Sequence, residues 1–393
     1  MLVGLGGAVA TTAIAGIELI RMGRQSRVGL PLAMENVDGL VDYADMRFDG
    51  WDLCGDDLST AARGHRVLEG EQAAAVDAAL RAVVPRQAVG GAGWCVNVDG
   101  TNRTGTNGHR AAIDRIVDDI RSFRISRRVD DVVVINLASV ERWPDLDAPL
   151  FANIDAFERG LDGDHNDISP AMLYAYASIS EGVPYGNFTP SFAADVPALM
   201  QFAERRNVPI AGKDGKTGQT MLKTVLAPAL RARALHVEGW FSTNILGNRD
   251  GLALADPGSL ESKLKTKGSV LDSILGYPVE DHVVQIHYYK PRGDNKEAWD
   301  NVDVVGFLGQ KMQIKIDFLC RDSILAAPLV IEIARVLDLA HQRGEGGIQE
   351  QLGLFFKAPM TPTGHAPEHA LEAQDRRLRA WLAAEKPVLA SAR

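Results

Sequence analysis

A regular alternation between apolar, strand-like runs and amphipathic stretches constrains the fold of this 393-residue chain more than any other feature. The stretch IDRIVDDIRSFR (113–124) has the apolar spacing of a helix, and the β-branched run DVVVINLAS (131–139) follows it. The same order returns in AMLYAYASISEG (171–182) before VPYGNFTPS (183–191), and again in PALMQFAERRN before VPIAGKD. Alternating units of this kind fold as a mostly parallel sheet with helices on both faces. The sequence therefore predicts a doubly wound α/β fold.

The chain opens with the order strand, glycine-rich turn and helix that is typical of dinucleotide-binding folds. The turn has the pattern Gly4-x-Gly6-Gly7-x-x-Ala10, whereas the strict dinucleotide fingerprint would place a glycine at Val9. The three glycines still allow a tight turn and a close approach of the backbone to a pyrophosphate at the helix N-terminus. Two interpretations stay open at this point: a dinucleotide site, and a purely structural turn between strand and helix.

A second glycine-rich turn, AGKDGKTGQT (211–220), contains a Gly-Lys-Thr triplet and precedes another helical stretch. A nucleotide-triphosphate loop requires a glycine five residues before the Gly-Lys pair, and Ile210 occupies that position, so the pattern fails. The unpaired N–H groups of the first helical turn, with the hydroxyls of Thr217 and Thr220, still suit a phosphate. The alternative is that Thr217 only caps the helix.

The pattern changes after residue 220. The stretches HVEGWFSTNILG, HVVQIHYYKPRG and VDVVGFLGQKMQIKIDFLC are rich in strand formers and contain period-two alternation. They predict an α+β region built on an antiparallel sheet. Two helical stretches, SILAAPLVIEIARVLDLAHQRG and PEHALEAQDRRLRAWLAAEK, then complete the pattern.

Charge and composition exclude some classes of function. The formal net charge is −9, and a nucleic-acid partner would require a basic surface, so we expect no nucleic acid. The cysteines (Cys54, Cys95 and Cys320) are odd in number and show no CxxC spacing, which indicates a reducing, cytoplasmic setting. The apolar N-terminus lacks the basic region of a signal peptide, and no other stretch approaches the length of a membrane span, so we expect no membrane partner.

Several lysines occur at positions that suit work on an anionic substrate. Lys263 and Lys267 are four residues apart and would share one face of a helix, where their charges repel unless an anion lies between them. Lys296 follows a strand and a turn. Lys357 lies in the apolar run GLFFKAPM, where partial burial would lower its pKa and make it a candidate base. Taken singly, each is better explained as a surface lysine whose charged end reaches water.

Three aspartates occur in comparable positions. Asp214 lies in the second glycine-rich turn, Asp250 lies in ILGNRDG, and Asp322 begins DSILAAPL. The default role of Asp322 is to cap the helix that it precedes. A carboxylate close to several lysines would instead orient them or shift their pKa values.

Together these stretches resemble the myo-inositol-1-phosphate synthase family, also called inositol-3-phosphate synthase. The set is specific although no single member is, and its forms are nearer to the archaeal and bacterial branch of the family. In the family's order, between residue 4 and about residue 360, the matching stretches are GLGGAVATT, GWDL, VINLASVER, NFTPS, AGKDGKTGQT, ILGNRDG, ESKLKTKGSVLD, PRGDNKEAWD, DSILAAPL and FFKAPM.

The resemblance implies conversion of D-glucose 6-phosphate to 1L-myo-inositol 1-phosphate (1D-myo-inositol 3-phosphate) with tightly held NAD. The C5 hydroxyl is oxidised, a base removes a C6 proton, the enolate closes the ring on the C1 aldehyde, and the hydride is returned. Clustered lysines suit this chemistry because they supply positive charge where the enolate oxygen develops. Some members of the family require a divalent metal and others a monovalent cation, and the sequence does not decide between them.

The same resemblance implies roles for particular residues. Asp52 is expected at the adenosine ribose, and residues 136–139 beside the nicotinamide. The catalytic residues would be Lys263, Lys267, Lys296, Lys357, Asp214 and Asp322. The sugar phosphate would be held by Thr217, Gly218, Gln219, Thr220, Lys267 and Lys296. NAD would be held by Gly4, Gly6, Gly7, Ala8, Val9, Asp52, Asn136, Leu137, Ala138, Ser139, Asn187, Asp214, Asn248 and Asp250.

The family's architecture implies an NAD-binding Rossmann domain (1–220) that the C-terminal segment (326–393) rejoins. An α+β catalytic and oligomerisation domain (221–325) would be inserted between them. Family members are typically homotetramers. Two alternatives stay open: a sugar-phosphate oxidoreductase with net release of NADH, and a non-catalytic sensor of sugar phosphate or NAD. Retention of the four lysines speaks against a sensor, because binding alone would not need them all.

Overall fold

The computed structural model describes residues 1–90, 93–95, 100–247 and 270–384. Its body is a seven-stranded sheet in the order β11-β6-β5-β4-β1-β2-β3, and every neighbouring pair is parallel. The strands are β1 (Leu2–Val3), β2 (Gly50–Asp52), β3 (Arg86–Gln87), β4 (Val134–Asn136), β5 (Tyr185–Asn187), β6 (Pro209–Gly212) and β11 (Gly347–Ile348). The strand order reverses between β1 and β4, and such switch points bind ligands in open α/β sheets. The predicted doubly wound fold is confirmed.

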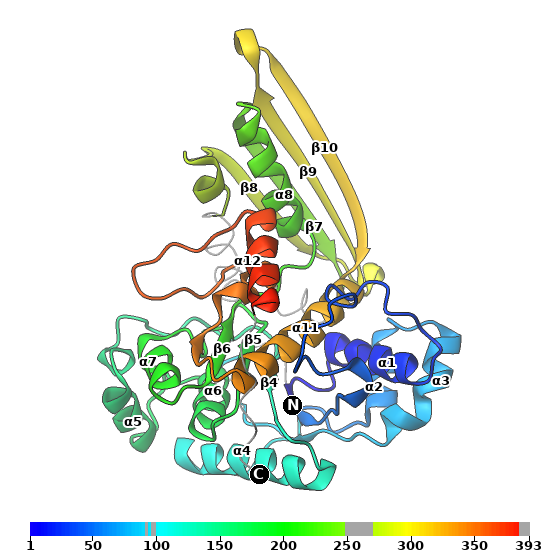
Figure 1. The fold of residues 1–393 in the computed structure, drawn as a ribbon, viewed down its shortest axis with the longest axis vertical. Helices are drawn as coiled ribbons and strands as arrows, with labels where there is room; N and C mark the ends of the chain where they lie inside the picture. The colour runs from blue at the N-terminus through cyan, green and yellow to red at the C-terminus, as the bar shows by residue number, and fades with distance from the viewer. Residues whose placement is uncertain (91–92, 96–99, 248–269, 385–393) are drawn as a thin grey trace.

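Helices cover both faces of this sheet (Figure 1). One core is formed with α4 (His109–Arg127), α5 (Ile154–Asp162), α6 (Pro170–Ser180) and α7 (Pro197–Arg205). The other is formed with α1 (Ala8–Arg21), α2 (Leu58–His65), α3 (Gly70–Arg81), α11 (Asp322–Gln342) and α12 (Leu371–Ala383). Short 3₁₀ helices are η1 (Tyr43–Asp45), η2 (Pro149–Phe151), η3 (Lys290–Arg292), η4 (Phe307–Gly309) and η5 (Glu350–Phe355). None of the helices in the described ranges combines the length and apolarity needed to cross a membrane.

Local sequence explains why these helices form where they do. In α4, Ile113, Ile116 and Ile120 recur at helical spacing and are all buried. The helix α6 is apolar on nearly all sides because it lies between α4 and α7. It begins where the Ser169 hydroxyl oxygen accepts a hydrogen bond of 3.2 Å from the Met172 N–H, which caps the helix.

A second, four-stranded sheet has the order β10-β9-β7-β8. Its strands are β7 (His236–Leu246), β8 (Asp281–Tyr288), β9 (Asn295–Val305) and β10 (Lys311–Arg321). One face packs on α8 (Gln219–Ala232). Trp240 and Val302 of the sheet share a hydrophobic core with Ala227 and Leu230 of this helix. The long strands β9 and β10 extend away from the body of the molecule (Figure 1).

The prediction of an antiparallel sheet is wrong for one pair of strands in this region. The pairs β10/β9 and β9/β7 are antiparallel, but β7 and β8 are parallel. Parallel neighbours need a crossover connection of about a dozen residues or more. Residues 247–280 separate β7 from β8 and supply that length, whereas the strand patterns alone carry no information about direction.

After β10 the chain returns to the seven-stranded sheet. There α11 packs against α1, and β11 pairs with β6 at the sheet edge. The segment after η5 lies alongside the second glycine-rich turn. The Lys216 N–H donates to the Phe355 carbonyl at 2.8 Å, and the Lys357 N–H donates to the Asp214 carbonyl at 2.7 Å. This pairing brings the segment after η5 to the carboxyl end of β6.

Candidate functional site

A cavity of about 670 Å³ opens at the carboxyl ends of β1, β2, β4 and β5. The predicted site residues in its wall are Gly4, Gly6, Gly7, Ala8, Val9, Asp52, Asn136, Leu137, Ala138, Ser139, Asp214, Thr217, Lys296, Asp322 and Lys357. The predicted residues that do not line it are Asn187, Gly218, Gln219 and Thr220. Four further predicted residues lie outside the described part of the chain: Lys263, Lys267, Asn248 and Asp250.

The first glycine-rich turn forms a tight cradle at the switch point. Gly4 has a positive φ of 86°, and a Cβ atom there would lie 3.0 Å from the Leu137 carbonyl oxygen. A Cβ atom on Gly7 would lie 3.1 Å from the Gly4 carbonyl oxygen. Larger residues would close this space, so the backbone stays open to an extended ligand at the N-terminus of α1. The turn therefore fits a dinucleotide pyrophosphate.

Asp52 lies at the end of β2 and is fixed in position by two backbone groups. Its Oδ2 accepts from the Gly6 N–H at 2.8 Å, and its Oδ1 accepts from the Cys54 N–H at 2.9 Å. An acidic residue at the end of this strand is the group that binds adenosine ribose hydroxyls in Rossmann folds. The usual spacing of about 20 residues does not apply here, because the chain between α1 and β2 is longer and includes η1.

Asn136 and Asn187 end neighbouring strands, but only Asn136 lines the cavity. Asn136 ends β4 in the cavity wall, where its Oδ1 accepts from the Ala138 N–H at 3.1 Å. Asn187 ends β5 and is fully enclosed, with its Nδ2 donating to the Ser191 carbonyl at 2.7 Å. Its Oδ1 accepts from the N–H and hydroxyl of Thr189. Asn187 thus shapes the loop after β5 and does not line the cavity.

Lys357 and Asp214 form a buried ion pair in the cavity wall. The Nζ of Lys357 lies 2.6 Å from Oδ1 of Asp214. Asp214 has a positive φ of 60°, and its Oδ2 is buried without a hydrogen-bond partner among the described residues. A buried carboxylate oxygen of this kind is suited to accept a hydrogen bond from a ligand. The pair therefore presents both a cation and a free acceptor to the cavity.

Asp322 joins two further predicted residues. Its Oδ1 accepts from the Thr217 hydroxyl at 3.1 Å and lies 3.5 Å from Nζ of Lys296. Thr217 comes from the second glycine-rich turn, Lys296 from β9 and Asp322 from α11. Residues far apart in the sequence therefore meet on one wall, next to the N-terminus of α8.

The capping role expected of Asp322 belongs to a different residue. Asp322 is itself the first residue of α11, and Asp294 accepts from the N–H and hydroxyl of Ser323 at 3.2 and 2.6 Å. Burial raises the pKa of Asp294, and the two Ser323 donors lower it. Because Asp294 satisfies the helix end, the Asp322 carboxylate is left to hold Thr217 and Lys296. The default interpretation of Asp322 as a cap is therefore wrong.

In the predicted phosphate-binding stretch, Thr217 lies in the cavity wall and Gln219 supports that wall from inside the protein. Thr217 lines the cavity, and its hydroxyl bonds to Asp322, so the alternative that it only caps α8 is wrong. Gln219 is buried behind it: its Nε2 donates to Asp300 at 3.1 Å, and its Oε1 accepts from Asn244 at 2.6 Å. Gly218 immediately precedes α8 and has no side chain to cap the helix. The N–H groups of the first turn remain suited to an anion.

Lys216 is a buried lysine that the sequence interpretation did not single out. Its Nζ donates to Oε1 of Gln374 in α12 at 2.5 Å, and burial lowers its pKa to about 7. The adjacent Thr217 belongs to the cavity wall. Lys216 therefore ties the second glycine-rich turn to the C-terminal helix.

Three cavity residues were missed by the sequence analysis. His65 at the end of α2 donates from Nε2 to the Gly6 carbonyl at 2.7 Å. Glu141 follows β4 and is buried, and Tyr174 of α6 accepts from the Val89 N–H at 2.9 Å. Glu141 alone has a sequence signal, an acidic residue after a buried strand and its polar loop, but this signal is too common to single it out. Within the described ranges, no group of three or more His, Cys, Asp and Glu side chains is arranged to hold a metal ion.

Comparison with known proteins agrees with this geometry. A family model described as Myo-inositol-1-phosphate synthase matches residues 19–383. Inositol-3-phosphate synthase 1 of Bacteroides thetaiotaomicron is 40% identical over 97% of this chain and 94% of its own length. The inositol-3-phosphate synthase of Saccharomyces cerevisiae is 32% identical over 87% of this chain and 71% of its own.

Solved structures are similar over nearly the whole chain. The inositol-3-phosphate synthase of Caenorhabditis elegans superposes with a TM-score of 0.90 at 26% identity, covering 97% of this chain and 84% of that one. A myo-inositol-1-phosphate synthase-related protein of Thermotoga maritima gives a TM-score of 0.80 at 24% identity, covering 98% of each chain. This second likeness concerns the fold alone.

Proposed function

Because the chain belongs to the myo-inositol-1-phosphate synthase family, we propose that it converts D-glucose 6-phosphate to 1L-myo-inositol 1-phosphate with NAD as a recycled cofactor. The observation that carries the proposal is the convergence on one cavity wall of a glycine cradle and two lysine–aspartate pairs. The cradle suits a dinucleotide, and the lysines suit an anionic sugar whose reaction develops negative charge.

The described residues fit NAD along the edge of the seven-stranded sheet. Gly4, Gly6 and Gly7 would hold the pyrophosphate, and Asp52 would bind the adenosine ribose hydroxyls. The free Oδ2 of Asp214 would accept a hydrogen bond from the other half of the dinucleotide or from the sugar. When bound, NAD supplies an acceptor for the C5 hydride and returns it in the last step, so that no net oxidation occurs.

The sugar phosphate would bind at the N-terminus of α8. The Thr217 hydroxyl and the Lys296 ammonium both contact Asp322 in the cavity wall, and the first turn of α8 follows Thr217 directly after Gly218. Gln219 would support the phosphate site without contacting the phosphate through its side chain, because that side chain is already bonded to Asp300 and Asn244. By the family resemblance, Lys267 would complete the phosphate site.

Lys357 would stabilise the enolate that precedes ring closure. Its ammonium is held by Asp214 in a buried position, where a fixed charge acts more strongly on a developing oxyanion than it would in water. Asp322 would hold the side chains of Lys296 and Thr217 in position to contact the substrate. Lys263 remains the proposed residue for proton transfer at the reacting oxygens, on the resemblance alone.

The domain division and the oligomer are also proposals. We assign residues 1–220 and 326–393 to the NAD-binding domain and residues 221–325 to the catalytic and oligomerisation domain. The four-stranded sheet packs one face on α8, while Val283, Trp299 and Leu319 are exposed. Strand register places these three on the opposite face, with Trp299 stacked on Phe241. Such an apolar sheet face suits burial between subunits of a homotetramer.

A product assay tests the proposed reaction. The purified protein is incubated with D-glucose 6-phosphate and catalytic NAD, products are identified by phosphorus NMR, and NADH is followed by absorbance. Inositol phosphate without accumulated NADH is expected, with a loss of roughly a hundredfold or more in Lys357→Ala. Lys311→Ala, an exposed lysine at the start of β10, is the matched control and should stay near wild type. Stoichiometric NADH would indicate a net oxidoreductase, and binding without turnover would indicate a sensor.

A further inference from the structure

Glu141 is a buried acidic residue with an unused oxygen in the cavity wall. It is 7% exposed, and its Oε1 accepts from the Ala171 N–H of α6 at 3.1 Å. Its Oε2 is buried and has no hydrogen-bond partner among the described residues. Its own N–H donates to the Ser191 hydroxyl at 2.9 Å, which fixes the backbone at this point. A buried carboxylate oxygen without a donor is costly, so a ligand donor is the natural partner.

The position of Glu141 points to the adenosine half of the dinucleotide. An acidic residue at the end of β2, here Asp52, marks that half in this fold. Tyr174 lies one turn after Ala171 in α6, and its ring centroid is 5.0 Å from that of Trp51, the residue before Asp52. Burial is the main cause that raises the pKa of the Tyr174 phenol, and the charges of Asp52 and Glu141 raise it further. The cavity wall around Tyr174 includes Val89 and Ala171, whose apolar side chains suit a flat aromatic base.

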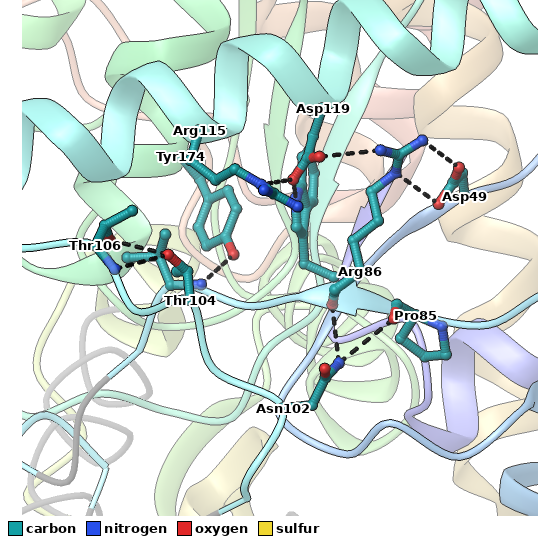
Figure 2. A network of polar contacts seen from close by, with 11 residues as sticks. Asp49, Pro85, Arg86, Asn102, Thr104, Thr106, Arg115, Asp119 and Tyr174 are labelled. Carbon is teal, nitrogen blue, oxygen red and sulfur yellow. Dashed lines mark hydrogen bonds and ion pairs between the residues drawn. The ribbon is translucent and has the colours of Figure 1, made fainter.

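This part of the wall is held rigidly from behind. Figure 2 shows the network that braces it, in which Arg86 bonds to Asp49 at 3.0 and 3.2 Å and to Asp119 at 2.9 Å. Asn102 donates to the carbonyl of Arg86 at 3.1 Å, and the Tyr174 hydroxyl accepts from the backbone after β3. Because these bonds fix the backbone around Tyr174, little free energy would be needed to order this part of the wall around a bound base.

We propose that Oε2 of Glu141 accepts a hydrogen bond from the 6-amino group of the adenine of NAD and thereby selects adenine over bases with a 6-carbonyl group. The inference rests on the proposed function, because it takes NAD as the bound dinucleotide. A carboxylate can only accept, so a carbonyl in place of the amine would meet Glu141 with lone pairs facing lone pairs.

The electrostatics of the site agree with this role. Burial raises the pKa of Glu141 to about 7, while the Ser169 hydroxyl, the Ala171 N–H and the Arg142 charge lower it. A donor that arrives at Oε2 stabilises the charged form and lowers the pKa further. Binding of the dinucleotide therefore favours loss of a proton from Glu141.

The test compares dissociation constants for NAD and for nicotinamide hypoxanthine dinucleotide, in which a carbonyl replaces the 6-amino group. Binding is measured by calorimetry at pH 8 without sugar phosphate. The wild type should prefer NAD by roughly tenfold to a hundredfold, the value of a hydrogen bond to a charged group. In Glu141→Gln the preference should fall to near one or reverse, because the amide N–H can donate to the hypoxanthine carbonyl. Glu141→Ala should show almost no preference.

Two further arms make the result specific. Asp147→Asn, an exposed acidic residue in the same segment, should keep the wild-type preference. The analogue 3-acetylpyridine adenine dinucleotide lacks the carboxamide N–H groups, and its affinity relative to NAD should be the same in wild type and Glu141→Gln. A change confined to that analogue would place Glu141 at the nicotinamide and overturn the proposal.

The wild-type comparison needs no variant, so a folding defect cannot hide the answer. A wild-type preference near one overturns the assignment of Glu141 while leaving NAD binding intact. A protein that binds neither dinucleotide contradicts the cofactor part of the proposed function, and the assignment of Glu141 with it.

Discussion

At the scale of single residues, we expect the buried pair of Lys357 and Asp214 to contribute to both stability and catalysis. Lys357→Ala leaves the Asp214 carboxylate buried without its cation, which should destabilise the protein by about 3 kcal/mol or more. Adding Asp214→Asn removes the unpaired charge and should restore part of that stability. It should not restore turnover, because the cation proposed to stabilise the enolate is still absent.

Chemical denaturation and turnover of the two single variants and the double variant measure this coupling. Equal losses of stability in Lys357→Ala and in the double variant would contradict the argument. So would recovery of turnover together with stability.

The charged form of Glu141, which is proposed to favour NAD binding, should lower the free energy of unfolding. Its pKa in the folded protein, about 7, lies above the ordinary value of 4.5, so folding takes up a proton between these values. The associated stabilisation is fully present below pH 4.5 and is lost as the pH rises through 7. Glu141→Gln should therefore be more stable than the wild type at pH 8, by an amount on the order of 3 kcal/mol, and the difference should shrink at pH 5.

Thermal denaturation of both proteins without NAD at the two pH values checks this prediction. Saturating NAD should reduce the advantage of the variant, because the ligand stabilises the wild type more. A difference in stability that does not vary with pH would show that Glu141 is not the group that titrates.

At the scale of elements, the N-terminus of α8 depends on a carboxylate in β9. Asp300 accepts from the Trp240 indole at 2.8 Å, from the Ser242 hydroxyl at 2.5 Å and from Gln219 at 3.1 Å. Asp300→Ala leaves three buried donors unsatisfied and frees Gln219 behind the proposed phosphate site. We expect a loss of roughly 2–4 kcal/mol in unfolding free energy and a rise of KM for the sugar phosphate larger than the fall in kcat.

Denaturation curves and steady-state kinetics measure these two effects. Asp303→Asn, a partly exposed residue of the same strand, should change neither. A fall in kcat with unchanged KM would place Asp300 in the chemical steps and not in phosphate positioning.

Most elements of the seven-stranded sheet follow from the sequence because their signals are local. Buried strands next to amphipathic helices, and the glycine-rich turn that contains Gly4 and Gly7, are visible in short windows of the sequence. The direction of β8 and the capping of α11 by Asp294 cannot be read from short windows, because each depends on a partner that local patterns do not specify. The positions of Asp214 and Asp322 in the chemistry were suggested by family resemblance and not by spacing. Glu141 stayed hidden because one acidic residue after a strand is common.

At the scale of the whole molecule, the two ends of the chain and its middle meet at one cavity. The cradle comes from the first ten residues, Lys296 from β9 and Lys357 from the segment after η5. Contacts so distant in sequence form only in the folded protein, so partial unfolding of either sheet should abolish the site. The proposed catalytic unit therefore includes the C-terminal return.

The exposed face of the four-stranded sheet leads to the last prediction. Trp299 is 38% exposed and stacks on Phe241, with ring centroids 5.8 Å apart. Trp299→Arg places a charge in the centre of the proposed subunit interface and should convert the proposed tetramer to smaller species, as measured by light scattering on a chain of 42.5 kDa. Val84→Arg, at an exposed apolar position in the connection between α3 and β3, should leave the mass unchanged. Since Lys296 lies on β9 with Trp299, loss of assembly should also weaken turnover. A wild-type monomer, or a variant that stays tetrameric, would show that this apolar face has another purpose.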